Sequence, residues 1–435
     1  MFWKTLNFLV RRQDYFNVIE VAACDFSRQT RELREAHQVE QFNRVWADAY
    51  GNTPFYAKWK QEHGLPDGIQ SLDETESWPI VTKRDLQKGA DLLVRTDRPA
   101  DGHSMTGGST GEPMRFGTWK EDGGLGVAHS WIGRRMYGVE PGDRTALLWG
   151  HQHLYGKGLN RQINVLKRKT KDRLLNFRRI QCFDLSPSAM QSACSQIVRF
   201  SPTFLIAVSC TATAFCRANR AQADACRRLG LKCVMCTGGA LSEDERAEIS
   251  TFFNAPVCMQ YGSVECADMA HTVPSGGYNV YWQTHILQPV ADDYGAQRNI
   301  VTCLTRRYLP LIRYDVGDYL NLYPDETRRP HRFISVEGRP NEIIKFSDGS
   351  AFYGGLLGEC VKQVPKVLAH QTIIHGDEVL ICVLADGKLT PEEADLIVLR
   401  SRTVVPALKT KKVSAEQRDR LKVSIGGKVP LVIYE

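Results

Sequence analysis

The sequence lacks any apolar stretch that could cross a membrane. A transmembrane helix needs roughly 20 predominantly apolar residues in a row, and no apolar run in these 435 residues approaches that length. The first 12 residues are briefly apolar, but Lys4 and Asn7 interrupt them and no small-residue cleavage site follows, so they are not typical of a secretory signal. Repeats and low-complexity tracts are also missing. We therefore expect a globular protein without a transmembrane segment.

A regular cysteine framework is missing as well. The 13 cysteines are odd in number and scattered along the chain. In a protein of this size that pattern indicates reduced thiols and a cytoplasmic location. Cys233 and Cys236 form a Cys-x-x-Cys pair, but they lie in the apolar run Lys232–Cys236. We interpret them as small hydrophobic residues of a buried strand.

Excess positive charge is confined to one segment. Residues 157–179 hold nine Lys and Arg against a single acid, Asp172, so their net charge of +8 exceeds the +7 of the whole chain. Such a segment could attract a polyphosphate, an acidic membrane or an acidic partner protein, or it could be a solvated helix face. Aromatic residues are sparse among these charges. Nucleic-acid binding is therefore not expected.

Short apolar runs alternate with amphipathic stretches from about residue 145 onward. The runs predict strands and the stretches predict helices, an alternation typical of an α/β sheet with helical crossovers. A polar helical region at 14–63 precedes them. The expected strands are 145–149, 203–208, 232–235, 256–259 and 299–304, and the expected helices between them are 187–199, 211–229 and 241–253.

The pattern changes after Val336-Glu-Gly-Arg-Pro340. The rest of the chain predicts a small α+β block, with strands near 379–384 and 421–433 and a helix near 391–402. We expect a large N-terminal α/β domain over residues 1–338 and a small mobile C-terminal domain over 340–435, with a hinge between them.

A glycine-rich patch lies at Ser104-Met-Thr-Gly-Gly-Ser-Thr-Gly-Glu-Pro113. Backbone N–H groups and hydroxyls of such a loop can wrap closely around phosphate oxygens. It is not a Walker A loop, because no Gly-Lys-Ser/Thr ends it. Gly107-x-Ser109-x-Gly111 has the spacing of a hydrolase nucleophile elbow, which should lead directly into a helix. The following residues, 113–117, are expected to be extended, which disfavours a hydrolase built on Ser109.

Further motifs follow in a fixed order. They are Thr237-Gly-Gly-Ala240, Gln260-Tyr-Gly-Ser-Val-Glu265, Tyr314-Asp-Val-Gly-Asp318 with Gly338-Arg339, and Ile425-Gly-Gly-Lys428. Together with the glycine-rich loop, this order resembles the adenylate-forming superfamily. Three further segments, 52–56, 78–85 and 310–314, resemble its phenylacetate–CoA ligase and CapK-like branch. The resemblance covers about residues 50–430 and implies the large adenylation domain and small mobile domain expected above.

The resemblance also implies a role for each motif residue. ATP and Mg²⁺ would bind at one site. The phosphates would lie on the loop, adenine would stack on Tyr261 and face the backbone of the Gly-Gly-Ala segment, and Glu265 would hold the metal. Asp318 and Arg339 would bind the ribose and α-phosphate, Lys428 would act in adenylation, and Asn341 would stand at the hinge. The ATP-binding residues so implied are Thr106, Gly107, Gly108, Ser109, Thr110, Gly111, Gly238, Gly239, Ala240, Gln260, Tyr261, Gly262, Ser263, Asp318 and Arg339.

The activity implied is that of an AMP-forming acyl-CoA synthetase. A carboxylic acid would react with ATP to give acyl-AMP and pyrophosphate, and the acyl group would then pass to coenzyme A. Coenzyme A or an acidic carrier protein could meet the basic segment 157–179, and an amine or hydroxyl acceptor is an alternative. Pocket walls are expected near Trp149, Ser209 and Gly239. Trp149 would suit an aromatic or flat acid, or it is a tryptophan of the core.

Three positions depart from the family pattern. Val264 stands where a Ser or Thr usually precedes the motif glutamate, Glu112 stands where the loop often has Lys, and Asn341 replaces a charged hinge residue. A catalytically weak nucleotide-binding homologue is therefore a second hypothesis. Cys266, His271 and His285 are candidate zinc ligands, but three residues do not complete a tetrahedral site, so zinc is not expected.

Overall fold

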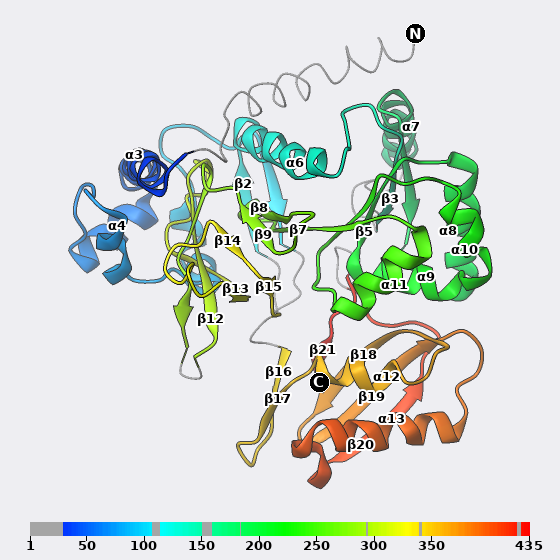
Figure 1. Cartoon of the computed structure of the whole chain (residues 1–435). Coiled ribbons are helices and arrows are strands. Elements are labelled where there is room, and N and C mark those ends of the chain that lie inside the picture. The colour runs from blue at the N-terminus through cyan, green and yellow to red at the C-terminus, as the bar shows by residue number, and fades with distance from the viewer. Residues whose placement is uncertain are drawn as a thin grey trace.

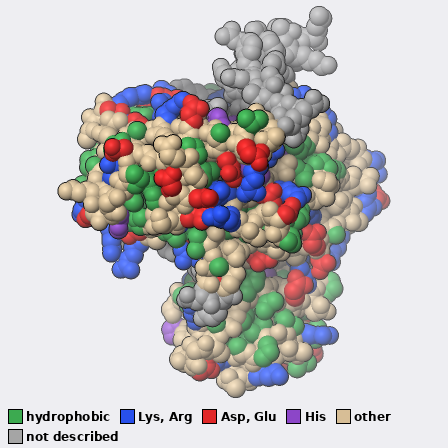
Figure 2. Space-filling model, turned by 60° about the vertical axis from the view of Figure 1, so that its left-hand side comes forward, with side chains coloured by type: hydrophobic (Ala, Val, Ile, Leu, Met, Phe, Trp, Pro, Cys, Tyr) green, Lys and Arg blue, Asp and Glu red, His purple; other side chains and the backbone are tan. Residues whose placement is uncertain are grey.

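The computed structural model describes residues 29–106, 114–149, 159–182, 184–292, 295–338, 342–423 and 428–435. Figure 1 shows a large upper body and a smaller group of C-terminal elements beneath it. Charged side chains of both signs are interspersed on the face of the body that Figure 2 displays. None of the helices in the described ranges is both long and apolar enough to span a membrane.

The body is built around an eight-stranded mixed sheet with the strand order β14-β9-β8-β7-β6-β5-β3-β4. Strands β4, β3, β5, β6 and β7 run parallel, and β8, β9 and β14 continue the sheet in antiparallel fashion. Their bounds are β3 Thr145–Trp149, β4 Phe177–Gln181, β5 Phe204–Val208, β6 Cys233–Thr237, β7 Val257–Ser263, β8 Ala267–Thr272, β9 Tyr278–Val280 and β14 Arg332–Phe333. The α/β class predicted from strand–helix alternation is confirmed.

Helices connect the parallel strands, as expected for parallel pairing. They are α7 Leu159–Leu174, α8 Pro187–Phe200, α9 Ser209–Ala218, α10 Ala223–Arg227 and α11 Glu243–Phe253, with a 3₁₀ turn η5 at Arg220–Gln222. The single helix expected over 211–229 is thus wrong in detail. The chain breaks at Asn219, whose buried side-chain amide bonds the carbonyls of Met190 and Phe215.

Other helices and two smaller sheets complete the body. The helices are α3 Arg31–Asn52, α4 Pro54–His63, η1 Leu72–Ser77, α5 Lys83–Lys88, η2 Ala90–Leu93, η3 Glu121–Gly123 and α6 Gly124–Met136. Strands β1 Gly102–Met105 and β2 Arg115–Thr118 form a hairpin. A five-stranded sheet contains β10 His285–Leu287, β11 Val290–Ala291, β12 Gln297–Cys303, β13 Tyr314–Asn321 and β15 Ser335–Val336. The polar region expected to be helical divides at Pro54, which starts α4.

The C-terminal elements form a four-stranded sheet in the order β20-β19-β18-β21 and a separate β16–β17 pair. Their bounds are β16 Ile343–Lys345, β17 Ala351–Tyr353, α12 Leu356–Val361, β18 Val367–His375, β19 Glu378–Ala385, α13 Pro391–Val404, η7 Pro406–Thr410, β20 Lys412–Gln417 and β21 Val432–Tyr434. The strand and helix expected near 379–384 and 391–402 are confirmed. The strand expected near 421–433 is observed only in part: among the described residues of that segment, Val432 and Ile433 lie in β21 and pair with β18.

The body and the C-terminal elements have separate hydrophobic cores. Apolar side chains from residue 344 onward, including Ile344, Ile381 and Ile397, form a core within the C-terminal elements. Leu368 and Leu384 instead belong to the core of the body, so the C-terminal sheet is docked against it. The hinge residues 339–341 lie outside the described ranges, and the boundary at 338–340 stays a prediction.

Candidate active site

The Thr237 and Gln260 motifs meet at the carboxyl ends of neighbouring parallel strands. Thr237 ends β6 and pairs in register with Gln260 of β7. Ser209, which follows β5, donates a hydrogen bond from its Oγ to the Gly239 carbonyl oxygen at 2.7 Å. The carboxyl edge of a parallel sheet is where ligands bind in open α/β folds. The expected grouping of Ser209 with Gly239 is therefore observed at the edge where a ligand site belongs.

Gly262 allows the second motif to turn tightly. A Cβ at this position would lie 2.4 Å from the carbonyl oxygen of Ala267, because β7 folds back against β8 there. Val264 and Glu265 occupy the turn between these strands, and Glu265 is partly exposed. The side chain of Val264 is 46% exposed. The turn thus presents a carboxylate at the motif edge and an exposed apolar side chain beside it.

Tyr261 connects the second motif to the third. Its hydroxyl donates a hydrogen bond to Asp318 Oδ2 at 2.9 Å, and both residues are buried. The Tyr261 ring packs edge-on against Tyr278 and Phe333, with centroids 6.5 Å and 5.9 Å away. Two residues that the sequence assigned to the base and the ribose of one nucleotide are therefore in direct contact.

Lys428 reaches the same edge from the C-terminal end of the chain. A Cβ added to Gly238 would lie 2.8 Å from Lys428 Cε and 3.4 Å from Nζ, so the lysine side chain lies directly against Gly238. Gly238 also has a φ of +79°, which favours glycine. Burial raises the pKa of the nearby Cys210 thiol, and the charge of Lys428 opposes that rise. The lysine predicted to act in adenylation thus lies beside the segment predicted to line the nucleotide.

The glycine-rich loop is held at its base. Thr106 N donates to the Met114 carbonyl oxygen at 3.0 Å, and Met114 N donates to Thr106 Oγ1 at 2.9 Å. The chain enters the loop from β1 and leaves it in the antiparallel β2. A nucleophile elbow leads from a strand into a helix, so this hairpin does not support the serine hydrolase hypothesis.

Several predicted residues lie outside the described ranges. They are Gly107, Gly108, Ser109, Thr110, Gly111 and Glu112 of the loop, Arg339 and Asn341 near the hinge, and Ile425, Gly426 and Gly427 before the lysine. Their roles stay predictions.

The candidate zinc ligands do not form a set of three metal-binding side chains in the described residues, although His285 contacts the backbone of Cys266. His285 Nε2 lies 2.8 Å from the Cys266 carbonyl oxygen and its Nδ1 lies 2.9 Å from Thr284 Oγ1, so both ring nitrogens have backbone or hydroxyl partners. His271 stacks on Tyr281 instead, and burial lowers its pKa to about 4. Across the described part of the chain, no three His, Cys, Asp or Glu side chains are placed to hold a metal ion. Cys266, His271 and His285 are therefore not arranged as a zinc site in this part of the structure.

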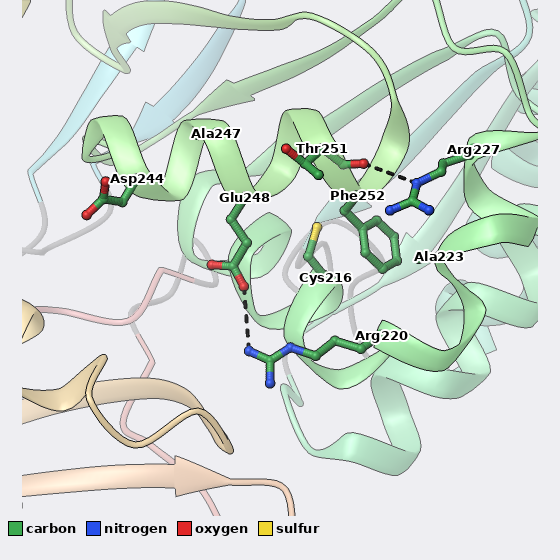
Figure 3. Close-up of a pocket in the computed structure, with 9 residues that line it drawn as sticks. All are labelled: Cys216, Arg220, Ala223, Arg227, Asp244, Ala247, Glu248, Thr251 and Phe252. Atoms are coloured by element: carbon green, nitrogen blue, oxygen red, sulfur yellow. Dashed lines mark hydrogen bonds and ion pairs between the residues drawn. The ribbon is translucent and has the colours of Figure 1, made fainter.

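A pocket that the sequence did not predict lies among the helices (Figure 3). It has a volume of about 520 Å³, with Cys216 and Phe252 buried within its wall and Arg220 and Arg227 among its lining residues. Arg220 lies 3.9 Å from Glu248, and Arg227 donates to the Thr251 carbonyl oxygen. Among the motif residues that the structure describes, none lines it. The pocket is thus separate from the motif edge.

The sequence also gave no functional signal for Asn299, which bonds Tyr261. It begins an apolar run that we interpreted only as a strand. A polar side chain inside such a run is the one feature that could have marked it.

Two curated proteins resemble this chain, whereas no family model matches it. Protein CapK of Staphylococcus aureus is 23% identical over 371 residues, which cover 81% of this chain and 79% of that protein. The phenylacetate-coenzyme A ligase of Aromatoleum evansii is 24% identical over 377 residues, which cover 80% of this chain and 79% of that ligase. Both alignments therefore extend over most of each protein.

Solved structures share the fold. A 2-hydroxyisobutyryl-CoA ligase in its postadenylation state, in complex with 2-HIB-AMP, matches with a TM-score of 0.70 at 19% identity, covering 94% of this chain and 90% of that one. Structures of the same ligase in its thioesterification state and in an open conformation match this chain with TM-scores of 0.56 and 0.53, respectively. This chain therefore shares the fold of these CoA ligases and is similar over most of its length to CapK and the phenylacetate-coenzyme A ligase.

Proposed function

We propose that this protein is an AMP-forming acyl-CoA synthetase. It joins a carboxylic acid to ATP as acyl-AMP with release of pyrophosphate, and then transfers the acyl group to coenzyme A. The observation that carries this proposal is the position of Lys428 against Gly238, at the edge where Tyr261 and Asp318 also meet. The TM-score is higher for the postadenylation state of the related ligase than for its thioesterification state, which supports the same arrangement.

In the first half-reaction, a carboxylate oxygen attacks the α-phosphorus of ATP and the bond to the β-phosphate breaks. Negative charge builds on the α-phosphate oxygens, and Lys428 is placed to stabilise it. Asp318 accepts hydrogen bonds from the ribose hydroxyls, and the Tyr261 ring holds the base. These residues orient the nucleotide so that the acid approaches in line with the leaving pyrophosphate.

Glu265 suits a Mg²⁺ ion. Its carboxylate is a hard oxygen donor in a partly exposed turn at the motif edge. Mg²⁺ is usually held by one or two carboxylates together with substrate phosphates, so a cluster of protein ligands is not required. Bound there, the ion would neutralise charge on the pyrophosphate.

In the second half-reaction, the sulfur of coenzyme A attacks the acyl carbonyl carbon and AMP leaves. Lys428 must withdraw to admit the acceptor, and rotation of the C-terminal elements about residues 339–341 would achieve this. In the present arrangement Lys362 Nζ donates to Ser242 Oγ at 2.9 Å across the two parts of the chain. This contact stabilises the adenylation arrangement and would break on rotation.

The basic segment 157–179 is our candidate for contact with the acceptor. Asp172 is buried and pairs with Arg179 at 2.9 Å, so the segment's one acid is already neutralised within it. Lys169, Lys171 and Arg178 are exposed. Coenzyme A or an acidic carrier protein would supply complementary charge.

A pyrophosphate-release screen tests the proposed function. The full-length protein is incubated with Mg²⁺ and ATP and with aryl, short-chain and hydroxy acids, each with and without coenzyme A. We expect release that depends on at least one acid and continues over many turnovers only with coenzyme A. Nucleotide binding without release for any acid would favour the weak homologue that Val264 suggests.

A further inference from the structure

Asn299 occupies an unusual place for a polar side chain. It lies in β12, is fully buried, and is followed by the buried residues Ile300 and Val301. Its amide nitrogen donates a hydrogen bond to Tyr261 Oη at 3.0 Å, whereas its buried Oδ1 has no hydrogen-bond partner among the described residues. A half-satisfied amide costs stability at a buried position. Packing alone therefore does not account for this residue.

The pairing of β12 with β13 is irregular at this residue. Arg298 pairs with Tyr319 and Ile300 pairs with Asp315, so the single residue Asn299 lies opposite the three residues 316–318. The extra residues form a bulge that contains Gly317, with a φ of +72°, and Asp318. Bulges re-aim side chains and are common next to active sites. Here the bulge brings Asp318 to the hydroxyl of Tyr261.

The hydrogen bonds run in one direction through these three residues. A tyrosine hydroxyl has one proton to donate and can also accept. Because the Asn299 amide donates to Tyr261 Oη, the hydroxyl proton is left to point at Asp318 Oδ2, 2.9 Å away. A hydrogen bond from a neutral hydroxyl to a carboxylate is strong and fixes the orientation of the acceptor.

We propose that Asn299 is a positioning residue for the nucleotide site: through the Tyr261 hydroxyl it fixes the Asp318 carboxylate that binds the ribose hydroxyls. This inference rests on the proposed function, because it takes the ribose as the ligand of Asp318. It also gives Tyr261 two separate tasks. The ring contacts the base, and the hydroxyl orients the carboxylate.

Calorimetric binding of ATP and 2′,3′-dideoxy-ATP to the full-length protein tests the inference without knowledge of the acid. Asn299→Leu removes the amide, and Tyr261→Phe removes the hydroxyl while keeping the ring. We expect each variant to bind ATP roughly 3–10-fold more weakly than the wild type, the loss of about one hydrogen bond. The affinity for dideoxy-ATP should not change, because this nucleotide has no ribose hydroxyl to donate a hydrogen bond to Asp318.

A double variant and a control sharpen the result. Asn299→Leu with Tyr261→Phe should bind ATP no more weakly than Tyr261→Phe alone, because both changes act through the same carboxylate. Tyr278→Phe is the control: it removes the hydroxyl of a buried tyrosine whose ring packs against the Tyr261 ring. This variant should bind both nucleotides with wild-type affinity. Tyr261→Phe keeps the test informative if Asn299→Leu fails to fold.

Equal weakening of both nucleotides by Asn299→Leu would overturn the inference, because it would indicate general damage to the site. Unchanged ATP binding in that variant would overturn it as well. If the wild type itself binds ATP and dideoxy-ATP equally, the ribose role of Asp318 fails and the inference fails with it. The proposed function is tested separately, by measuring acid-dependent pyrophosphate release with the wild-type protein.

Discussion

At the scale of single residues, Gly238 and Lys428 define the candidate site because they touch although they lie 190 residues apart in the sequence. The sequence supplied both as family motifs, but it could not show that they meet. Their contact depends on how the C-terminal elements dock against the body, and the spacing of motifs along the sequence does not reveal this docking. Asn299 was not predicted as a functional residue for a related reason: its proposed role depends on a bulge in the neighbouring strand β13.

Replacing Lys428 by Ala should slow adenylate formation by about 10²–10³-fold, because in the proposed mechanism the lysine stabilises charge that develops in the transition state. Transfer from a supplied acyl-AMP to coenzyme A should stay close to the wild-type rate. The two half-reactions are measured separately by pyrophosphate release and thioester formation. Lys412→Ala is the control, since that side chain is 73% exposed and pairs with Glu378. Equal losses in both half-reactions would refute the assigned role.

Replacing Gly238 by Ala should impair adenylation without touching the lysine chemically. The new Cβ would lie 2.8 Å from Lys428 Cε and would push the side chain away. Gly230→Ala is a matched control, because it has a similar positive φ of +64° but no atom within 4 Å of the new Cβ. Both variants share backbone strain, so comparison of their melting temperatures and adenylation rates isolates the clash. If the two variants adenylate equally well, Lys428 does not need its place beside Gly238.

At the scale of elements, apolar runs predicted the central strands well. Each of the runs at 145, 203, 232 and 256 became a parallel strand, because buried parallel strands are apolar on both faces. The run at 299 became β12, a largely buried antiparallel strand of the five-stranded sheet. The failures have tertiary causes. A buried asparagine breaks the helix expected over 211–229, and the 421–433 segment packs Leu421 and Val429 against the body core instead of pairing along its length.

The basic element α7 supports a test of acceptor binding. Changing Lys167, Arg168, Lys169 and Lys171 together to Gln should raise the apparent KM for coenzyme A and flatten its salt dependence, because surface attraction is screened within about 8–10 Å at physiological salt. The KM for ATP should not change. Steady-state kinetics at several salt concentrations measure both. If neither the KM nor its salt dependence moves, the segment is a solvated face, and liposome sedimentation of the same variant distinguishes a membrane contact.

At the scale of the whole molecule, His370 makes docking of the C-terminal sheet sensitive to pH. Burial, with help from the nearby charges of Arg217 and Lys362, lowers its pKa to about 4. An undocked or unfolded histidine titrates near 6.5. Between pH 4 and 6.5, His370 binds fewer protons in the docked state than in the undocked or unfolded state. The docked state therefore has its full stability above about pH 6.5 and becomes less stable as the pH falls toward 4.

Thermal melting of His370→Gln checks this prediction. The wild type should lose about 2 kcal/mol through His370 between pH 7.5 and 5.0, and the variant should lose correspondingly less. His375→Gln, an exposed histidine of the same strand, should behave like the wild type. His271 and His331 also have pKa values lowered to about 4, so part of the pH dependence will persist in every variant. An unchanged pH dependence in His370→Gln would show that this histidine does not govern docking.

The central claim is that this protein makes an acyl-AMP. The most direct measurement is mass spectrometry of the product formed from Mg²⁺, ATP and a panel of carboxylic acids without coenzyme A, followed by a chase with coenzyme A. We predict an acyl-AMP in stoichiometric amount with one class of acid and its conversion to a thioester and AMP in the chase. Lys428→Ala should form the same acyl-AMP about 10²–10³-fold more slowly. Cleavage of ATP to ADP and phosphate, or acyl-AMP formation by Lys428→Ala at the wild-type rate, would contradict this claim.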